Sequence, residues 1–284
     1  MRVFRMTLCC APGATAFGLL LMCAVTVGPG DVGSAAKSGR AADFTPADRA
    51  TPVVPPVAVP VRRPPVLSLA ALLVRRPVNR RHTAALPRIV PRADWLADAA
   101  YRRPPARYAD RVTAVFIHHT DSPNGYDCAD TPRVIRYLYA GQAGGRNWDD
   151  IGYNFLVDRC GTIYEGRAGG VDKAVVGAHA QGFNQGTAGI AAIGTFTAGT
   201  PVPPSMAKSI AALSAWKLGL ANIDPRSRVR LTSTNSLSRF HKGRTAEFNA
   251  IAAHRDEYET YCPGQALMAA LPEIRRRAAA LQGR

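Results

Sequence analysis

The chain has no apolar run long enough to cross a membrane. Its N-terminal apolar segment, Ala14 to Val27, is shorter than the roughly 20 residues that a transmembrane helix needs. Arg2 and Arg5 precede this segment, and the small residues of "GSAA" follow it. The pattern is typical of a secretory signal peptide, so residues 1–36 are predicted to be one. We therefore expect an exported mature protein without a stable membrane span.

Cysteine is scarce as well, with six residues in the chain. Three of them lie in the predicted signal peptide and would leave with it: Cys9, Cys10 and Cys23. An odd number remains, Cys128, Cys160 and Cys262, so one needs a separate explanation. Pairing Cys128 with Cys160 would close a loop of about 33 residues and stabilise the fold by roughly 3–4 kcal/mol. Cys262 would then be either a buried inert thiol or a metal ligand.

Acidic residues are few relative to basic ones, 20 against 36, which gives a net charge of +16. Residues 1–86 hold 11 basic and 3 acidic residues, or +8, and residues 87–284 hold 25 and 17, also +8. The excess of positive charge is denser in residues 1–86, because that segment is the shorter one. Basic clusters can bind nucleic acid, but for an exported protein we expect anionic wall polymers or a membrane surface instead. A solvated linker without a partner explains the same charge.

The chain shows no internal repeat, and residues 37–86 show little that could pack. They include "TPVVPPVAVPVRRPPV", and proline at this density favours extended polyproline II over helix or central strand. We predict a Pro/Arg-rich, disordered linker there, interrupted by one apolar island, "LSLAALLV". The folded domain is predicted to span residues 87–284.

Strands and helices alternate along that domain, which predicts an α/β fold with a sheet flanked by helices. The expected strands are 112–119, 188–196, 249–254 and a pair within 153–167 around a Cys-Gly turn. The expected helices are 131–142, 203–223 and 264–282. The last is predicted in two pieces because Pro272 interrupts it.

Histidine raises the prospect of a metal site. The predicted domain holds five: His118, His119, His179, His241 and His254. Zinc binds imidazole nitrogen and thiolate sulfur, and a catalytic zinc keeps three protein ligands and one open position. Since His254 precedes Cys262 by only eight residues, both can reach one ion. Adjacent strand residues point to opposite faces, so only one of His118 and His119 can join them.

Four motifs carry a family resemblance: "FIHHT", "WDDIGYNFLVDRCGTIYEGR", "VVGAHAQGFNQGTAGIAAIGTF" and "HRDEYETYCPG". In this order, and after the entry "PRIVPRADW", they resemble the peptidoglycan recognition protein and zinc-dependent N-acetylmuramoyl-L-alanine amidase family (type 2 amidases). The likeness covers about residues 87–280 and is greatest to secreted bacterial members. It implies a mixed central β-sheet flanked by helices.

The resemblance also implies roles for residues. The zinc ligands would be His118, His254 and Cys262, which leaves Cys128 and Cys160 as the disulfide pair. Tyr153 and Thr260 would lie beside the metal as catalytic residues, and His179 and Asn184 would line a peptide-binding groove. His119 would face away and support the site, and His241 would lie in a surface loop. No carboxylate stands out as a base; Glu165 and Asp256 are expected to be structural.

The activity implied is hydrolysis, with Zn²⁺ as cofactor, of the amide between N-acetylmuramic acid and L-alanine in peptidoglycan. The expected partners are peptidoglycan and muropeptides, without nucleic acid. We expect a monomer that is secreted and associated with the cell wall. Two alternatives are a recognition module that binds peptidoglycan without cutting it and a structural zinc domain that presents the basic linker. The cysteine ligand favours the enzyme, because members that only bind usually lack it. A structural zinc would need a fourth protein ligand.

Overall fold

The computed structural model describes residues 82–96 and 104–284. The predicted signal peptide, the apolar island and the linker up to residue 81 lie outside the described residues.

A six-stranded sheet forms the centre of the domain, with strand order β1–β4–β3–β5–β2–β8. Strands β3 and β4 are antiparallel, around the predicted Cys-Gly turn, and the other pairs are parallel. The sheet is therefore mixed, as expected. Its strands are β1 (Ile89–Val90), β2 (Ala114–His119), β3 (Phe155–Val157), β4 (Ile163–Glu165), β5 (Thr187–Ala192) and β8 (Ile251–Ala253).

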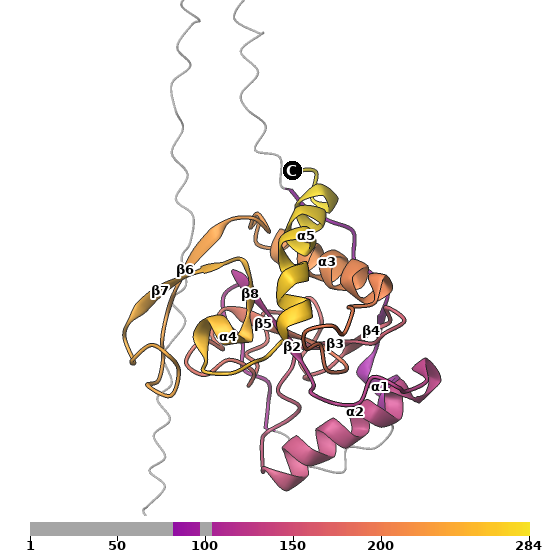
Figure 1. Ribbon diagram of the computed structural model, residues 1–284. Helices are drawn as coiled ribbons and strands as arrows, with labels where there is room; N and C mark the ends of the chain where they lie inside the picture. The colour runs from indigo at the N-terminus through magenta and orange to yellow at the C-terminus, as the bar shows by residue number, and fades with distance from the viewer. Residues whose placement is uncertain (1–81, 97–103) are drawn as a thin grey trace, which may run out of the picture. The chain divides into compact units, whose positions relative to one another are not determined.

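Helices cover both faces of this sheet (Figure 1). On one face lie α3 (Pro204–Gly219) and α5 (Gln265–Leu281), which pack against each other. On the other lie α1 (Arg92–Trp95) and α2 (Thr131–Tyr139). A 3₁₀ turn, η2 (Cys128–Asp130), precedes α2, a π-helical turn, η3 (Ala140–Gly145), continues it, and a short helix, α4 (His254–Glu257), follows β8. The predicted α/β architecture is confirmed.

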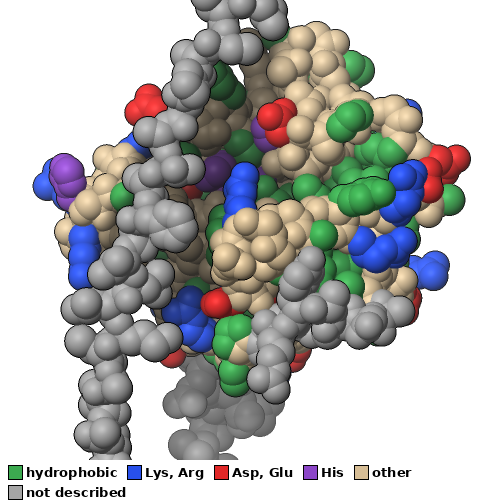
Figure 2. Space-filling model, turned by 90° about the horizontal axis from the view of Figure 1, so that it is seen from below, with side chains coloured by type: hydrophobic (Ala, Val, Ile, Leu, Met, Phe, Trp, Pro, Cys, Tyr) green, Lys and Arg blue, Asp and Glu red, His purple; other side chains and the backbone are tan. Residues whose placement is uncertain are grey.

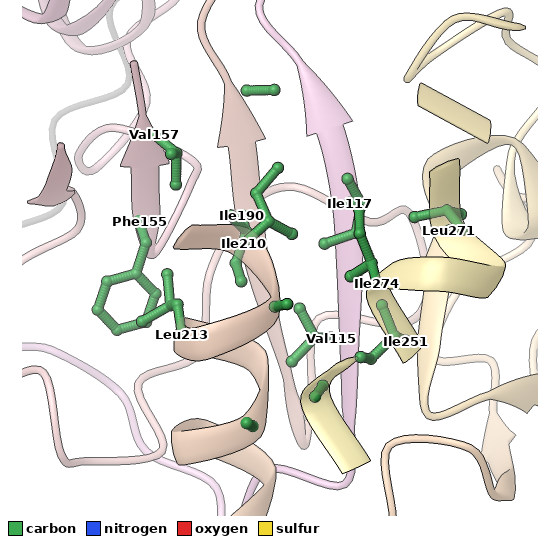
Figure 3. Close-up of a cluster of buried hydrophobic side chains, with 14 of the residues drawn as sticks. Val115, Ile117, Phe155, Val157, Ile190, Ile210, Leu213, Ile251, Leu271 and Ile274 are labelled. Atoms are coloured by element: carbon green, nitrogen blue, oxygen red, sulfur yellow. The ribbon is translucent and has the colours of Figure 1, made fainter. Parts of the chain in front are cut away.

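The alternation of side chains along β2 and β5 divides the core. Val115, Ile117 and Ile190 point toward α3 and α5, where they meet residues such as Leu213 and Ile274 (Figure 3). All five are almost fully buried, and each such side chain contributes about 1.5–3 kcal/mol on burial. The intervening residues of β2, including His118, face the opposite side of the sheet.

Helix α5 is continuous, and the prediction of two pieces was wrong. Pro272 lies inside it. Proline in a helix interior costs about 3 kcal/mol because it removes one hydrogen bond and crowds the preceding turn. Leu267 and Leu271 before Pro272, and Ile274 and Ala278 after it, all bury in the same cluster with α3. Packing on both sides of the proline therefore holds the helix together.

A second sheet, β6 (Arg228–Thr232) paired with β7 (Thr245–Asn249), was not predicted. Its inner face packs Val229 and Leu231 against Phe248. The period-two alternation of these residues was visible in the sequence but short. His241 is exposed in the connecting loop, where it was expected.

Cys128 and Cys160 form the predicted disulfide, which ties η2 to the turn between β3 and β4.

Contacts at the N-terminal end of the domain begin before Pro87. The His82 backbone N–H donates to Asn222 Oδ1 at 3.1 Å, and Ala84 packs against the main core. The folded part therefore starts a few residues earlier than expected. No helix within 82–96 and 104–284 combines the length and the apolar character that a membrane crossing requires.

Candidate metal centre

Two parallel strands bring His118 and His254 together. In the pairing of β2 with β8, Ile117 lies opposite Ala253. The residues that follow them, His118 and His254, therefore lie at the same edge of the sheet. Their ring centroids are 4.5 Å apart. His118 is fully buried and His254 is partly buried.

The "CPG" turn delivers Cys262 to the same place. The His119 backbone N–H donates to Cys262 Sγ at 3.2 Å, and Thr260 Oγ1 accepts from the Cys262 N–H at 3.2 Å. Gly264 has a φ of 90°, and a Cβ there would lie 2.2 Å from the Phe196 carbonyl oxygen. Only glycine fits so close to the Phe196 backbone, which explains why position 264 of this turn is a glycine.

The ligand atoms of His118, His254 and Cys262 all lie within 4.8 Å of one another. His118 Nδ1 is 3.9 Å from Cys262 Sγ. The structure thus brings the three predicted ligands together. In the part of the chain that it describes, no fourth histidine, cysteine or carboxylate joins this cluster.

The protonation states suit a metal cation. Burial, reinforced by neighbouring histidines, lowers the pKa of His118 well below its ordinary value, and burial lowers that of His254 to about 4. Both imidazoles are therefore neutral near pH 7, the form that binds metals. Burial also raises the pKa of the Cys262 thiol to about 12. A bound divalent cation would supply the missing positive charge and favour the thiolate. Two imidazoles and one thiolate fit the donor set of a three-ligand zinc site.

His179 lies behind His118. Its Nδ1 is 3.2 Å from His118 Nε2, and burial lowers its pKa to about 3. The ring packs closely on Gly189 of β5, where an added Cβ would lie 2.4 Å from it. His179 was predicted to bind substrate; it also contacts a predicted zinc ligand. Asn184, predicted with it, accepts from the N–H groups of His179 and Ala180 and so orders this loop.

Tyr153 and Thr260 lie at the same site. The Tyr153 ring centroid is 5.3 Å from that of His118. Burial, with a contribution from Cys262, raises the pKa of Tyr153, so its hydroxyl keeps its proton. Thr260 Oγ1 already accepts a hydrogen bond from the Cys262 N–H, and its own hydroxyl proton is available to donate.

The two acids singled out in the sequence are structural in the fold. Glu165 accepts from the Arg92 N–H, and Asp256 accepts from the Ala253 N–H at the start of α4.

Sequence reasoning missed Glu257, although it stands in the same motif. Its side chain is fully buried, and its Oε1 lies 3.3 Å from His254 Nε2. Burial raises the pKa of this carboxyl to about 9. Tyr258, the next residue, stacks on His254. The two ring centroids lie 5.5 Å apart with an interplanar angle of 10°.

A groove opens beside the three predicted ligands. His179, His254 and Tyr258 lie on its wall with Asn184 and Trp148, and its charged lining comprises Arg107, Arg146, Arg167 and Asp149. Figure 2 shows histidine side chains (purple) near the middle of the face seen from below, with basic and acidic side chains close to them. The groove therefore carries an excess of positive charge next to the predicted ligand His254.

Comparison with known proteins gives a consistent family. The family model described as N-acetylmuramoyl-L-alanine amidase (Amidase_2) matches residues 108–265. Peptidoglycan-recognition protein LE of Drosophila melanogaster is 36% identical over 123 residues, covering 42% of this chain and 33% of that protein. An N-acetylmuramoyl-L-alanine amidase of Sus scrofa is 34% identical over 186 residues, covering 64% of this chain and 26% of that protein.

The chain thus spans about a third or less of the length of these two relatives. Among solved structures, bumblebee PGRP-SA superposes with a TM-score of 0.51 at 23% identity, covering 66% of this chain and 95% of that one. This likeness concerns the fold alone.

Proposed function

The chain belongs to the N-acetylmuramoyl-L-alanine amidase family (Amidase_2), and from this we propose that it is a zinc-dependent hydrolase of the amide between N-acetylmuramic acid and L-alanine in peptidoglycan. The observation that carries the proposal is the cluster of His118, His254 and Cys262. It offers three donors, and one of them, His254, lines a groove. A catalytic zinc keeps an open position, whereas a structural zinc is closed by a fourth ligand.

Zinc, when bound, polarises a carbonyl and lowers the pKa of water. The remaining chemistry belongs to the protein. The protonated Tyr153 hydroxyl donates a hydrogen bond to the oxyanion that develops on the scissile carbonyl. Thr260 orients the attacking water or the carbonyl through its hydroxyl proton. The His119 N–H stabilises the Cys262 sulfur as a thiolate.

The groove supports a peptide substrate with carboxylate groups. Arg107, Arg146 and Arg167 outnumber Asp149 along its lining. Arginine binds carboxylates through paired, charge-assisted hydrogen bonds. A stem peptide lying in this groove places its N-terminal amide beside the metal ligands. We further propose that the protein is exported and acts at the cell wall, as the N-terminal sequence pattern indicates.

The alternative is a recognition module that binds peptidoglycan without cutting it. Relatives include both recognition proteins and amidases. The cysteine ligand favours the enzyme, since its thiolate has no role in binding a peptide alone.

The test is mass spectrometry of purified muropeptides after incubation with the zinc-loaded protein, paired with calorimetric binding on the same preparation. We expect release of the intact stem peptide, beginning with L-alanine, from the sugar. Binding without release of stem peptide, with zinc present, would identify a recognition module and overturn the proposed activity.

A further inference from the structure

Glu257 is a buried carboxyl that lies beside the imidazole of His254. It ends α4, three residues after His254, and its Oε1 lies 3.3 Å from His254 Nε2. Its side chain is fully buried, yet neither carboxyl oxygen has a hydrogen bond of normal geometry within the described residues. Burying a carboxyl whose hydrogen bonds are incomplete costs free energy. An apolar residue of similar size would fill the space at lower cost, so the carboxyl calls for a reason.

Besides burial, the Gln181 backbone N–H and the charges of Arg239 and Asp256 act on Glu257. The Arg239 guanidinium, however, is held elsewhere. Its Nε donates to the backbone oxygens of Arg255 and Tyr258, and its Nη2 lies 3.9 Å from Glu259. The Glu257 carboxyl instead faces the imidazole of a predicted zinc ligand.

We propose that Glu257 is a positioning residue for His254: its carboxyl oxygen accepts a hydrogen bond from His254 Nε2–H and so leaves Nδ1 to bind the metal. This inference rests on the proposed function, because it assumes that the cluster holds zinc. A small rotation of either group turns the 3.3 Å contact into a normal hydrogen bond. A metal held at Nδ1 would make the Nε2–H a stronger donor toward the buried carboxyl.

The other imidazole of the site has the same arrangement. His118 turns Nδ1 toward Cys262 Sγ and Nε2 toward His179 Nδ1. Both histidines of the cluster therefore have a buried partner at Nε2, His179 for His118 and Glu257 for His254. Such partners fix the tautomer and the ring orientation of a ligand, and their loss typically lowers metal affinity 10–100-fold. The stacked Tyr258 ring restrains the plane of His254 from a second direction.

The experiment measures zinc affinity by competition with a chromogenic chelator on the full mature protein. We expect Glu257→Gln, which can still accept a hydrogen bond but cannot become a carboxylate, to bind zinc about 10-fold more weakly. Glu257→Leu, which can do neither, should bind about 100-fold more weakly. Glu259→Gln is the matched control, since it makes the same substitution two residues away in a side chain that is 90% exposed, and it should bind zinc like wild type.

A merely structural role is separated by the stability of the metal-free protein. The midpoint of chemical unfolding without zinc should stay unchanged or rise in Glu257→Leu, because a buried carboxyl with incomplete hydrogen bonds is removed. Zinc affinities of both Glu257 variants within twofold of wild type would overturn the inference while hydrolysis by wild type still stood. Conversely, a wild type that binds zinc without hydrolysing muropeptides would overturn the proposed function and leave this inference intact, because the readout is affinity.

Discussion

At the scale of single residues, strand geometry gives the two adjacent histidines of "FIHHT" different positions, because their side chains point to opposite faces of the sheet. His118 faces the cluster with His254 and Cys262. His119 contributes its backbone N–H to the cysteine sulfur, and its Nδ1 is buried without a hydrogen-bond partner in the described residues. The neighbour pair therefore offers a matched test of the metal site.

We expect His118→Ala to lose zinc, because two remaining ligands hold the ion weakly. His119→Ala should keep about one zinc per chain, since its backbone N–H is retained. Elemental analysis of the purified variants measures both. Full metal content in His118→Ala would show that the ion is bound elsewhere.

Tyr153→Phe removes one hydroxyl and leaves the predicted ligands in place. We expect zinc content and muropeptide binding to be unchanged, with hydrolysis reduced by about 10²–10³, the usual effect of losing one oxyanion donor.

Cys262→Ser should behave differently from Tyr153→Phe. Most zinc and most hydrolysis should be lost while muropeptide still binds, because a hydroxyl stays protonated and is a poor zinc ligand. Stem-peptide release and calorimetric binding on the same preparations distinguish the two. Wild-type turnover in Tyr153→Phe would remove this residue from the catalytic step.

At the scale of elements, α3 is tied to the loop that follows β4 by a buried lysine. Lys217 Nζ donates to the carbonyl oxygens of Val171 and Lys173, and the residue is only 3% exposed. Burial lowers the pKa of this ammonium to about 8 from an ordinary 10.5. The unfolded chain therefore binds more protons than the folded one between these two values.

The free energy of unfolding should accordingly depend on pH through Lys217. Between about pH 8 and 10.5, stability of wild type should rise with pH relative to Lys217→Met, by at most about 1.4 kcal/mol per pH unit. Below pH 8 the difference between the two proteins should be constant. Denaturant unfolding of both proteins across this range measures it. A difference that stays flat above pH 8 would show that the two carbonyl contacts, not burial, control the charge of this lysine.

The elements that the sequence predicted well are those with long or repeated patterns. The apolar β-branched run before His118 indicated β2, and Thr131–Pro132 marked the start of α2. The hairpin of β6 and β7 was missed because its alternating residues, such as Val229 and Leu231, form too short a pattern to outweigh the polar residues around it. Pro272 led to the wrong prediction of a break in α5. Local helix propensity does not include the packing of both halves of the helix on one cluster, which holds it together.

The same limit applies to the site. Its three metal donors could be proposed from residue type and motif order. Glu257 could not, because its role depends on one helical turn after β8 folding its side chain back under His254. A glutamate in a polar motif reads as a solvated residue until the fold shows it to be fully buried.

At the scale of the whole molecule, the boundary between the linker and the domain has a testable position. His82 bonds to Asn222, and the backbone of Thr83 and Ala84 lies so close to Gly219 that an added Cβ there would be 3.2 Å from the Thr83 Cα. The short segment 82–86 thus belongs to the fold, whereas residues 37–81 show, apart from one apolar island, little in their sequence that could pack.

Two deletions separate these segments. Removing residues 37–81 should leave hydrolysis of a small soluble muropeptide and the unfolding midpoint nearly unchanged. Removing residues 37–86 should lower the midpoint, because Ala84 leaves the main core and the hydrogen bond from His82 is lost. If the arginine pairs of the linker bind anionic wall polymers, both deletions should weaken binding to intact walls equally, and the wild-type advantage should shrink as salt rises. Loss of activity on the soluble muropeptide after the shorter deletion would show instead that residues 37–81 contribute to the catalytic groove, because neither wall binding nor domain stability limits turnover of a free substrate.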